Sequence, residues 1–272
     1  MSRIVDAAKS ILPGRLRAAL SRALYPYRHG RRFFTPYVIR KEMEGVIFDF
    51  LIGDRTGRNW YDRVCINNPV WLEMRFIRDH VAQKGDVVFE CGSHHGCSTI
   101  LLSSWVGDNG KVVAFEPFPA NFEILQKNLD LNDLRNVQPR MEAVGAVPGT
   151  ITFDESSSAV TSSGAGVDVK VSRLDEYEHL NPTLLKIDVE GFEMQVLQGA
   201  KNILWRRPKL AIELHTELLP RYGASVEDIF RLIGVENYRV WIQRRDDQQP
   251  ETFDMRTPIE SRVHLFFIPI AS

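Results

Sequence analysis

The chain has 272 residues, of which 44% are hydrophobic and 25% are charged. This composition is typical of a globular protein and excludes a disordered or fibrous chain. The net charge of −1 argues against general polyanion binding, and three cysteines are too few for a disulfide framework and favour a reducing compartment. No apolar run reaches the roughly 18 residues that span a membrane. The N-terminus also shows no pattern of a secretory signal, so a cytoplasmic location is expected.

The first 41 residues differ from the rest of the chain in charge. Residues 1–41 contain ten Lys or Arg side chains and one acid, Asp6, which gives a net charge of +9 and leaves −10 for residues 42–272. Their apolar residues recur at helical spacing, so we expect a basic helical extension followed by one domain over residues 42–272. Three interpretations stay open: a helix lying on an anionic membrane surface, an organellar targeting segment, or a helical lid or oligomer arm with solvated charges. No pattern indicates the oligomeric state.

From residue 42 onward, short apolar runs typical of strands alternate with segments of helical periodicity. The predicted strands span residues 45–50, 86–90, 111–116, 184–188, 209–214, 238–242 and 263–270, and the predicted helices span residues 70–85, 98–106, 119–131 and 193–204. Continuous apolar strands separated by helices indicate a parallel sheet covered on both faces. The last two strands are expected to close one edge of it as an antiparallel pair.

A Ser/Gly-rich stretch interrupts this alternation at residues 149–171. Short strand-like runs flank it, and the sheet pattern resumes afterwards. We therefore expect a flexible hairpin here, with residues 156–166 acting as a lid.

Acidic residues end three of the predicted strands. They are Glu90, Glu116 and Asp188, and the carboxyl ends of parallel strands meet at one edge of a sheet. Glu90 precedes a GxxxG turn, in which Gly92 permits a ligand to approach the backbone and Gly96 permits the next helix to pack closely. Glu116 follows one strand later, where a carboxylate can accept both hydroxyls of a ribose. The pattern predicts an adenosine-type ligand.

The segment from Leu184 to Ala200, LLKIDVEGFEMQVLQGA, closely resembles the most specific motif of the FkbM-type methyltransferases, which are class I S-adenosylmethionine-dependent enzymes. Supporting matches in the family's order are Trp60-Tyr61-Asp62, residues 88–96, Ala114-Phe115-Glu116-Pro117, Leu174-Asp175 and Glu213-Leu214-His215. The resemblance implies an α/β fold with a Rossmann-like, seven-stranded, mostly parallel sheet and helices on both faces. It also implies methyl transfer to a hydroxyl of a sugar, glycan or secondary metabolite. Residues 1–40 fall outside the resemblance.

Methyl transfer requires a site for the donor S-adenosylmethionine and one for the acceptor. The residues expected to hold the donor are Glu90, Gly92, Ser93, Gly96, Glu116 and Glu142, with Glu142 or its neighbours flanking the adenine. An alcohol is a poor nucleophile, so a general base helps the reaction. Asp188, Glu190 and His215 are the candidates to orient or deprotonate the acceptor, and an imidazole of unperturbed pKa ~6.5 suits a base near neutrality.

A divalent metal is conceivable in the same place but is not expected. Asp188, Glu213 and His215 could supply an O,O,N site for Mg²⁺ or a transition metal. Their spacing matches no dedicated metal motif, so the sequence predicts no metal site.

Two other functions compete with methyl transfer. An NAD-linked oxidoreductase would share the fold, but the third glycine of the GxGxxG fingerprint is missing. A non-catalytic, membrane-associated scaffold would use residues 1–41 as its working surface. Nucleic acid is disfavoured as a partner because residues 42–272 carry a charge of −10 and lack the Asn/Asp-Pro-Pro-aromatic tetrapeptide of amino-methylating enzymes.

Overall fold

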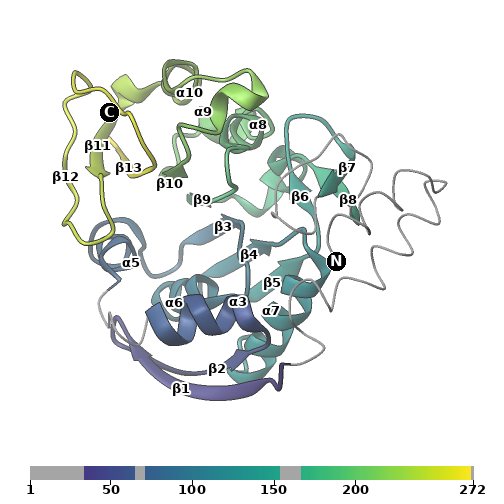
Figure 1. Cartoon of the computed structure of the whole chain (residues 1–272). Helices are drawn as coiled ribbons and strands as arrows, with labels where there is room; N and C mark the ends of the chain where they lie inside the picture. Colours follow the sequence, from purple (N-terminus) through teal and green to yellow (C-terminus); the bar gives the residue numbers. More distant parts are fainter. Residues whose placement is uncertain (1–33, 65–70, 154–166, 271–272) are drawn as a thin grey trace.

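The computed structural model describes residues 34–64, 71–153 and 167–270, and its centre is one eight-stranded sheet (Figure 1). In spatial order the strands are β12 Glu251–Thr252, β11 Tyr238–Gln243, β13 Val263–Pro269, β10 Lys209–Leu214, β9 Leu184–Ile187, β3 Val87–Cys91, β4 Lys111–Phe115 and β5 Val137–Arg140. Neighbouring strands from β10 to β5 are parallel, and β13 pairs antiparallel with both β10 and β11. The resemblance implied seven strands in the sheet, and the structure has eight. Six of the predicted runs lie in it; β5 and the two-residue edge strand β12, which pairs with β11, were not predicted, and the run at residues 45–50 lies in a separate hairpin.

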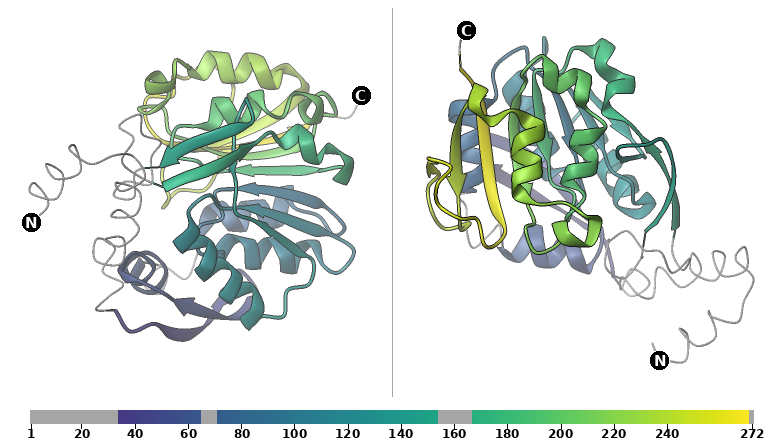
Figure 2. Two further views of the ribbon diagram at one scale, coloured as in Figure 1. Left: turned by 90° about the vertical axis from the view of Figure 1, so that its right-hand side faces the viewer. Right: turned by 90° about the horizontal axis from the view of Figure 1, so that it is seen from above.

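Helices cover both faces of this sheet (Figure 2). On one face lie α8 Glu193–Gln198, α9 Lys201–Trp205 and α10 Val226–Ile233, and on the other lie α6 Cys97–Val106, α7 Pro119–Leu131 and α5 Leu72–Phe76. The two faces take alternate residues of each strand: in β3, Phe89 packs with the first layer and Val88 with the second. Burial on both sides explains why these strands are apolar without interruption. Among the described residues, no helix has both the length and the apolar character needed to cross a membrane.

Two predicted helices differ from those observed. The helix predicted over residues 193–204 is two helices that are separated at Gly199. A Cβ built on Gly199 would lie 2.2 Å from the carbonyl oxygen of Gly145, so only glycine fits at this break. The second of them starts afresh, with the Asp175 carboxylate accepting the backbone N–H groups of residues 202 and 203. The helix predicted over residues 70–85 ends at Val81, since α5 continues into a π-helical turn, η3 Ile77–Val81, and Ala82 is extended.

An antiparallel hairpin, β1 Tyr37–Met43 and β2 Val46–Ile52, packs beside α6 and α7 (Figure 1). Residues 37–41, which the sequence placed at the end of the helical extension, are therefore part of a strand. Residues 1–33 lie outside the described part of the chain. A second small sheet contains β6 Ala143–Val144, β8 Val167–Ser172 and β7 Gly149–Phe153, so the predicted hairpin over residues 149–171 is confirmed. The tip assigned as a lid lies outside the described residues.

Asn128 of α7 connects this hairpin to the glycine turn after β3. Its side-chain oxygen accepts the backbone N–H of Leu51 at 2.6 Å, and its amide nitrogen donates to the carbonyl of His95 at 2.8 Å. The side chain is fully buried, so neither group has water as an alternative partner.

We expect Asn128→Ala to lower the free energy of unfolding by about 2–4 kcal/mol, because two buried backbone groups lose their partners. Urea denaturation measures this. The adjacent Lys127, whose exposed side chain only pairs with Glu123 at 2.7 Å, is the matched control, and Lys127→Ala should cost under about 0.5 kcal/mol. Equal losses in the two variants would contradict the assigned role.

Candidate active site

A cavity of about 860 Å³ opens at the carboxyl ends of the parallel strands. Its wall includes the glycine turn after β3, the residues after β4 and β9, and the end of β10. All three of the predicted acceptor residues and four of the six predicted donor residues line it: Asp188, Glu190, His215, Gly92, Ser93, Glu116 and Glu142. The strands thus bring together side chains that are up to 123 positions apart in the sequence, as the strand-end pattern predicted.

At Gly92 the backbone after β3 comes close to the backbone after β9. It has φ +89°, and a Cβ built on it would lie 1.8 Å from the backbone oxygen of Asp188. The N–H groups of Gly92 and Ser93 both donate to the carbonyl of Phe115, at 2.9 and 3.1 Å. Only glycine satisfies both the positive φ and the close approach, so the turn is fixed in place without covering the cavity.

The two predicted donor residues that do not line the cavity hold the turn from behind. Glu90 is fully buried, and its carboxylate accepts the hydroxyls of Ser98 and Thr99 in the first turn of α6, each at 2.5 Å. Burial raises the pKa of Glu90. A Cβ on Gly96 would lie 2.5 Å from a methyl carbon of Leu125 in α7, so this glycine permits close packing. In the structure both residues support the binding surface.

Glu116 presents its carboxylate at the cavity from the end of β4. It accepts the backbone N–H of His94 at 2.8 Å and of Phe118 at 2.9 Å, and the amide of Asn121 at 3.4 Å. Burial outweighs these bonds and raises the pKa of Glu116 to about 7. Oε1 accepts from Phe118 and, at the long distance of 3.4 Å, from Asn121, whereas Oε2 accepts from His94, so the carboxylate is oriented and retains capacity to accept hydroxyl groups.

Glu142 lies on the same wall in a different environment. Its carboxylate accepts Ser172 at 2.5 Å, Tyr177 at 2.7 Å and Lys170 at 3.0 Å. Burial acts against ionisation, but these three donors outweigh it and lower the pKa of Glu142. Its hydrogen-bonding capacity is thus largely used within the protein.

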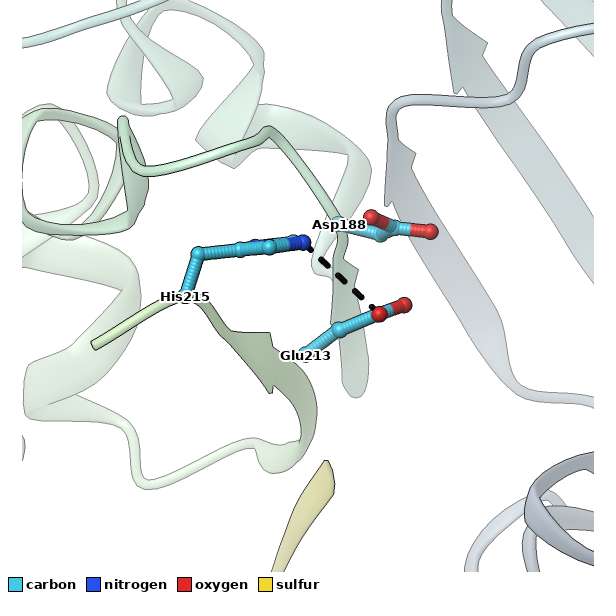
Figure 3. A group of neighbouring side chains, drawn as sticks. All are labelled: Asp188, Glu213 and His215. Carbon is cyan, nitrogen blue, oxygen red and sulfur yellow. Dashed lines mark ion pairs between the residues drawn. The ribbon is translucent and has the colours of Figure 1, made fainter. Parts of the chain in front are cut away.

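The three predicted acceptor residues meet around one imidazole. His215 Nδ1 lies 2.8 Å from Oε1 of Glu193, while Nε2 lies 3.4 Å from Glu190 and 3.7 Å from Glu213. Figure 3 shows His215, Glu213 and Asp188 at the ends of β10 and β9, with their side chains extending toward the same side. The buried Glu193, at the start of α8, is thus the nearest acidic partner of the histidine.

Electrostatics changes the expected roles of these groups. Desolvation would lower the pKa of His215, but the Glu193 hydrogen bond and the charges of Glu190 and Glu213 raise it to about 9. The imidazole is therefore protonated at neutral pH and donates hydrogen bonds. Burial, together with the charge of Glu213, raises the pKa of Asp188 to about 6, close to neutrality. A carboxylate therefore fits the role of base better than the histidine.

Further charged residues line the cavity beside the predicted ones. Lys186 lies 3.9 Å from Asp188, and Arg262 contacts Glu213 while forming two bonds to Asp246 at 2.7 and 2.8 Å. His264, in β13, stands opposite Glu213 in the strand register. The antiparallel insertion of β13 brings the C-terminal residues here, and no local sequence signal reports that pairing.

Aromatic side chains form part of the cavity wall, and two of them follow the β1–β2 hairpin in the sequence. Tyr61 donates or accepts a hydrogen bond with His94 Nδ1 at 2.7 Å, and Trp60 is 50% exposed. The aromatic residues of the cavity are Trp60, Tyr61, Trp71, Phe115, Phe118, Phe192 and Tyr222. Of these residues, Trp60 and Tyr61 belong to the Trp60-Tyr61-Asp62 segment that resembles the family in sequence.

The model of the methyltransferase FkbM domain matches residues 90–240, which is more than half of the chain and includes the glycine turn, Glu116 and the acceptor cluster. The chain belongs to the FkbM methyltransferase family. It is 30% identical to the hexuronic acid methyltransferase AglP of Haloferax volcanii, over 56% of this chain and 63% of AglP. It is 29% identical to Methyltransferase 1 of Beauveria bassiana, over 43% of this chain and 59% of that protein.

The match therefore spans less than two thirds of the length of both relatives. Among solved structures, the FkbM methyltransferase of Methylobacillus flagellatus KT is 21% identical, with a TM-score of 0.49 over 67% of this chain and 43% of that one.

Gly92→Ala tests whether the close approach at the turn is required. We expect it to lower the free energy of unfolding by about 3–5 kcal/mol, through φ strain and a clash with the Asp188 carbonyl. Gly85 is the matched control, since its φ is +85° and nothing lies within 4 Å of a Cβ built there. Gly85→Ala should cost only the strain, about 1–2 kcal/mol. Denaturant unfolding of both variants measures the difference, and equal values would show that the clash is relieved.

Proposed function

We propose that this FkbM family protein is an S-adenosylmethionine-dependent O-methyltransferase acting on a hydroxyl of a sugar, glycan or secondary metabolite. The observation that carries the proposal is the oriented, partly unsatisfied Glu116 carboxylate beside a glycine turn, in a family defined by methyl transfer. S-adenosylmethionine supplies an electrophilic methyl group on a sulfonium.

The donor half of the cavity fits such a ligand. The backbone of Gly92 and Ser93 forms one wall of the cavity, and Glu116 beside it would accept the ribose hydroxyls. Glu142, further along the wall, would flank the adenine. Glu90 and Gly96 would act from behind, by fixing the turn and α6.

In the acceptor half, the protonated His215 would donate a hydrogen bond that orients the acceptor oxygen. Asp188 or Glu190 would take its proton as the methyl group is transferred. Because Glu193 holds the imidazole at 2.8 Å, the donor direction of His215 is set before the acceptor binds.

A sugar acceptor is supported by two features. Exposed aromatic surface, such as that of Trp60, packs well against the apolar face of a pyranose ring. The relative AglP is named as a hexuronic acid methyltransferase, so a protein of similar sequence is named for a sugar substrate.

The N-terminal residues outside the described part of the chain are strongly basic. Residues 1–33, with a net charge of +7, would form a basic extension that contacts anionic membrane surfaces. Flotation with anionic liposomes, compared between the full chain and one lacking residues 1–33, tests this contact. Equal flotation would contradict it.

Binding of S-adenosylhomocysteine, the stable product of the donor, is the first test. Isothermal titration should give one site per chain, and a ligand at 100 times its dissociation constant should stabilise the fold by about 2.7 kcal/mol. Glu116→Gln should weaken binding at least tenfold, and NAD should not bind. Binding of NAD in place of the product would favour an oxidoreductase instead.

The pKa of Glu116 gives this binding a pH dependence. Only the ionised carboxylate accepts two hydroxyls, and with a pKa of about 7 it is mostly protonated at pH 6 and mostly ionised at pH 8. The dissociation constant should therefore rise about tenfold from pH 8 to pH 6. In Glu116→Gln this pH dependence should disappear, and its persistence would assign the titration to another group.

The acceptor class can be tested by incubating the full chain with labelled S-adenosylmethionine and panels of neutral sugars, uronic acids and phenols. We expect label in a base-stable ether of a sugar, and Asp188→Asn should reduce the rate at least 100-fold while leaving product binding intact. A base-labile methyl ester would show that a carboxylate, and not a hydroxyl, is methylated.

A further inference from the structure

The cluster at the ends of β9 and β10 has the donor atoms of a cation site. One oxygen each of Asp188 and Glu213 and one nitrogen of His215 all lie within 4.8 Å of one another. Their side chains converge from adjacent parallel strands (Figure 3). We propose that these three residues bind a divalent metal ion that contacts the acceptor hydroxyl; the second half of this statement rests on the proposed function.

The separations suit an ion better than direct contacts. Around an ion with ligands at 2.0–2.2 Å, neighbouring ligand atoms lie about 3 Å apart and opposite ones about 4 Å apart. The 3.7 Å between His215 Nε2 and Glu213 Oε1 falls in this range. It exceeds the usual 2.7–3.2 Å of an N–H···O hydrogen bond, so the pair is close without being bonded.

Glu193 sets the histidine in the form that a metal requires. Its Oε1 accepts both the N–H of Gly191 at 2.9 Å and the Nδ1 proton of His215 at 2.8 Å, and the side chain is fully buried. With Nδ1 carrying a proton, Nε2 is the nitrogen that faces Asp188 and Glu213. A buried carboxylate that fixes the outer nitrogen in this way is the usual support of a metal-binding histidine.

The side chains around the cluster carry an excess of negative charge that a cation would offset. The fixed cations are Lys186, 3.9 Å from Asp188, and Arg262, which also binds Asp246. The acids that line or support this part of the cavity are Glu73, Asp188, Glu190, Glu193, Glu213 and Asp246. These six acids exceed the two fixed cations by four, and a divalent ion would offset half of that excess.

A second, independent observation points to a ligand at the same place. His264 is 95% buried, and its Nδ1 has no hydrogen-bond partner among the described residues. This atom lies 4.0 Å from Oε2 of Glu213 and 3.7 Å from Glu73, across the cavity wall from the cluster. A buried polar atom without a partner is costly, and an ion or its bound water would supply the partner.

With such an ion bound, the acidic residues of the acceptor half would have separate roles. Taking the place of the Nε2 proton of His215 and of its hydrogen bond, the ion would bind the acceptor oxygen and lower the pKa of its hydroxyl, with Asp188 as a ligand. Glu190, whose side chain is 60% exposed, stays free to accept the proton. In the step, the O–H bond breaks toward Glu190, the O–CH₃ bond forms, and the C–S bond breaks with its electron pair returning to sulfur.

Mn²⁺ binding to the full chain, in the absence of donor and acceptor, tests the site directly. Because the room-temperature electron paramagnetic resonance signal of Mn²⁺ is lost on binding, a titration counts the sites. We expect one site per chain. Asp188→Asn and Glu213→Gln should each weaken Mn²⁺ binding at least 100-fold, and Glu193→Gln about 10–100-fold. Asp133→Asn, an exposed acid paired only with Arg135 in the described structure, is the control and should bind like the wild type.

Binding of S-adenosylhomocysteine to the same proteins separates the two proposals and confirms that each variant folds. Product binding that survives in Glu213→Gln, together with lost Mn²⁺ binding, supports the metal site. Absence of saturable Mn²⁺ binding to the wild type, or binding unchanged in Asp188→Asn and Glu213→Gln, overturns it while leaving the methyltransferase proposal intact. Failure of the wild type to bind the product would overturn the proposed function whatever Mn²⁺ does.

Discussion

The approach of Gly92 to the backbone oxygen of Asp188 is the contact on which the geometry of the cavity depends. Gly92 follows β3 and Asp188 follows β9, and these two strands lie side by side in the sheet. One strand leads into the donor turn and the other into the acceptor cluster. Because a Cβ at position 92 would be 1.8 Å from that oxygen, the distance between the two halves is fixed by backbone atoms, which cannot change rotamer.

A buried lysine links the two halves electrostatically. Lys186 in β9 is paired in register with Glu90 in β3, and it is 3% exposed. Burial opposes its charge, but Glu73, Asp188 and the fully buried Glu90 outweigh that effect and raise its pKa. The lysine therefore offsets the acid that supports the donor turn as well as the acid of the acceptor cluster. Removing it would leave carboxylates on both sides without their nearest cation.

Local sequence patterns predicted most of the fold and the position of the site. Apolar runs located the central strands, α7 matched its predicted bounds, and the strand-end acids Glu116 and Asp188 line the cavity as expected. The failures have non-local causes. The break at Gly199 depends on the backbone of Gly145, 54 positions earlier, and His264 reaches Glu213 only because β13 inserts beside β10. Such pairings are set by tertiary packing, which no single window of sequence contains.

The environment, and not the residue type, decides what each carboxylate of the cavity can do. Glu116 and Glu142 are both acids of the donor wall, yet burial raises the pKa of the first to about 7 and three donors lower that of the second. Glu142 receives a charged lysine and two hydroxyls, whereas Glu116 receives only neutral N–H groups. A ligand that donates hydroxyl groups therefore gains most at Glu116, because it completes the solvation of an anion that the protein has only partly stabilised.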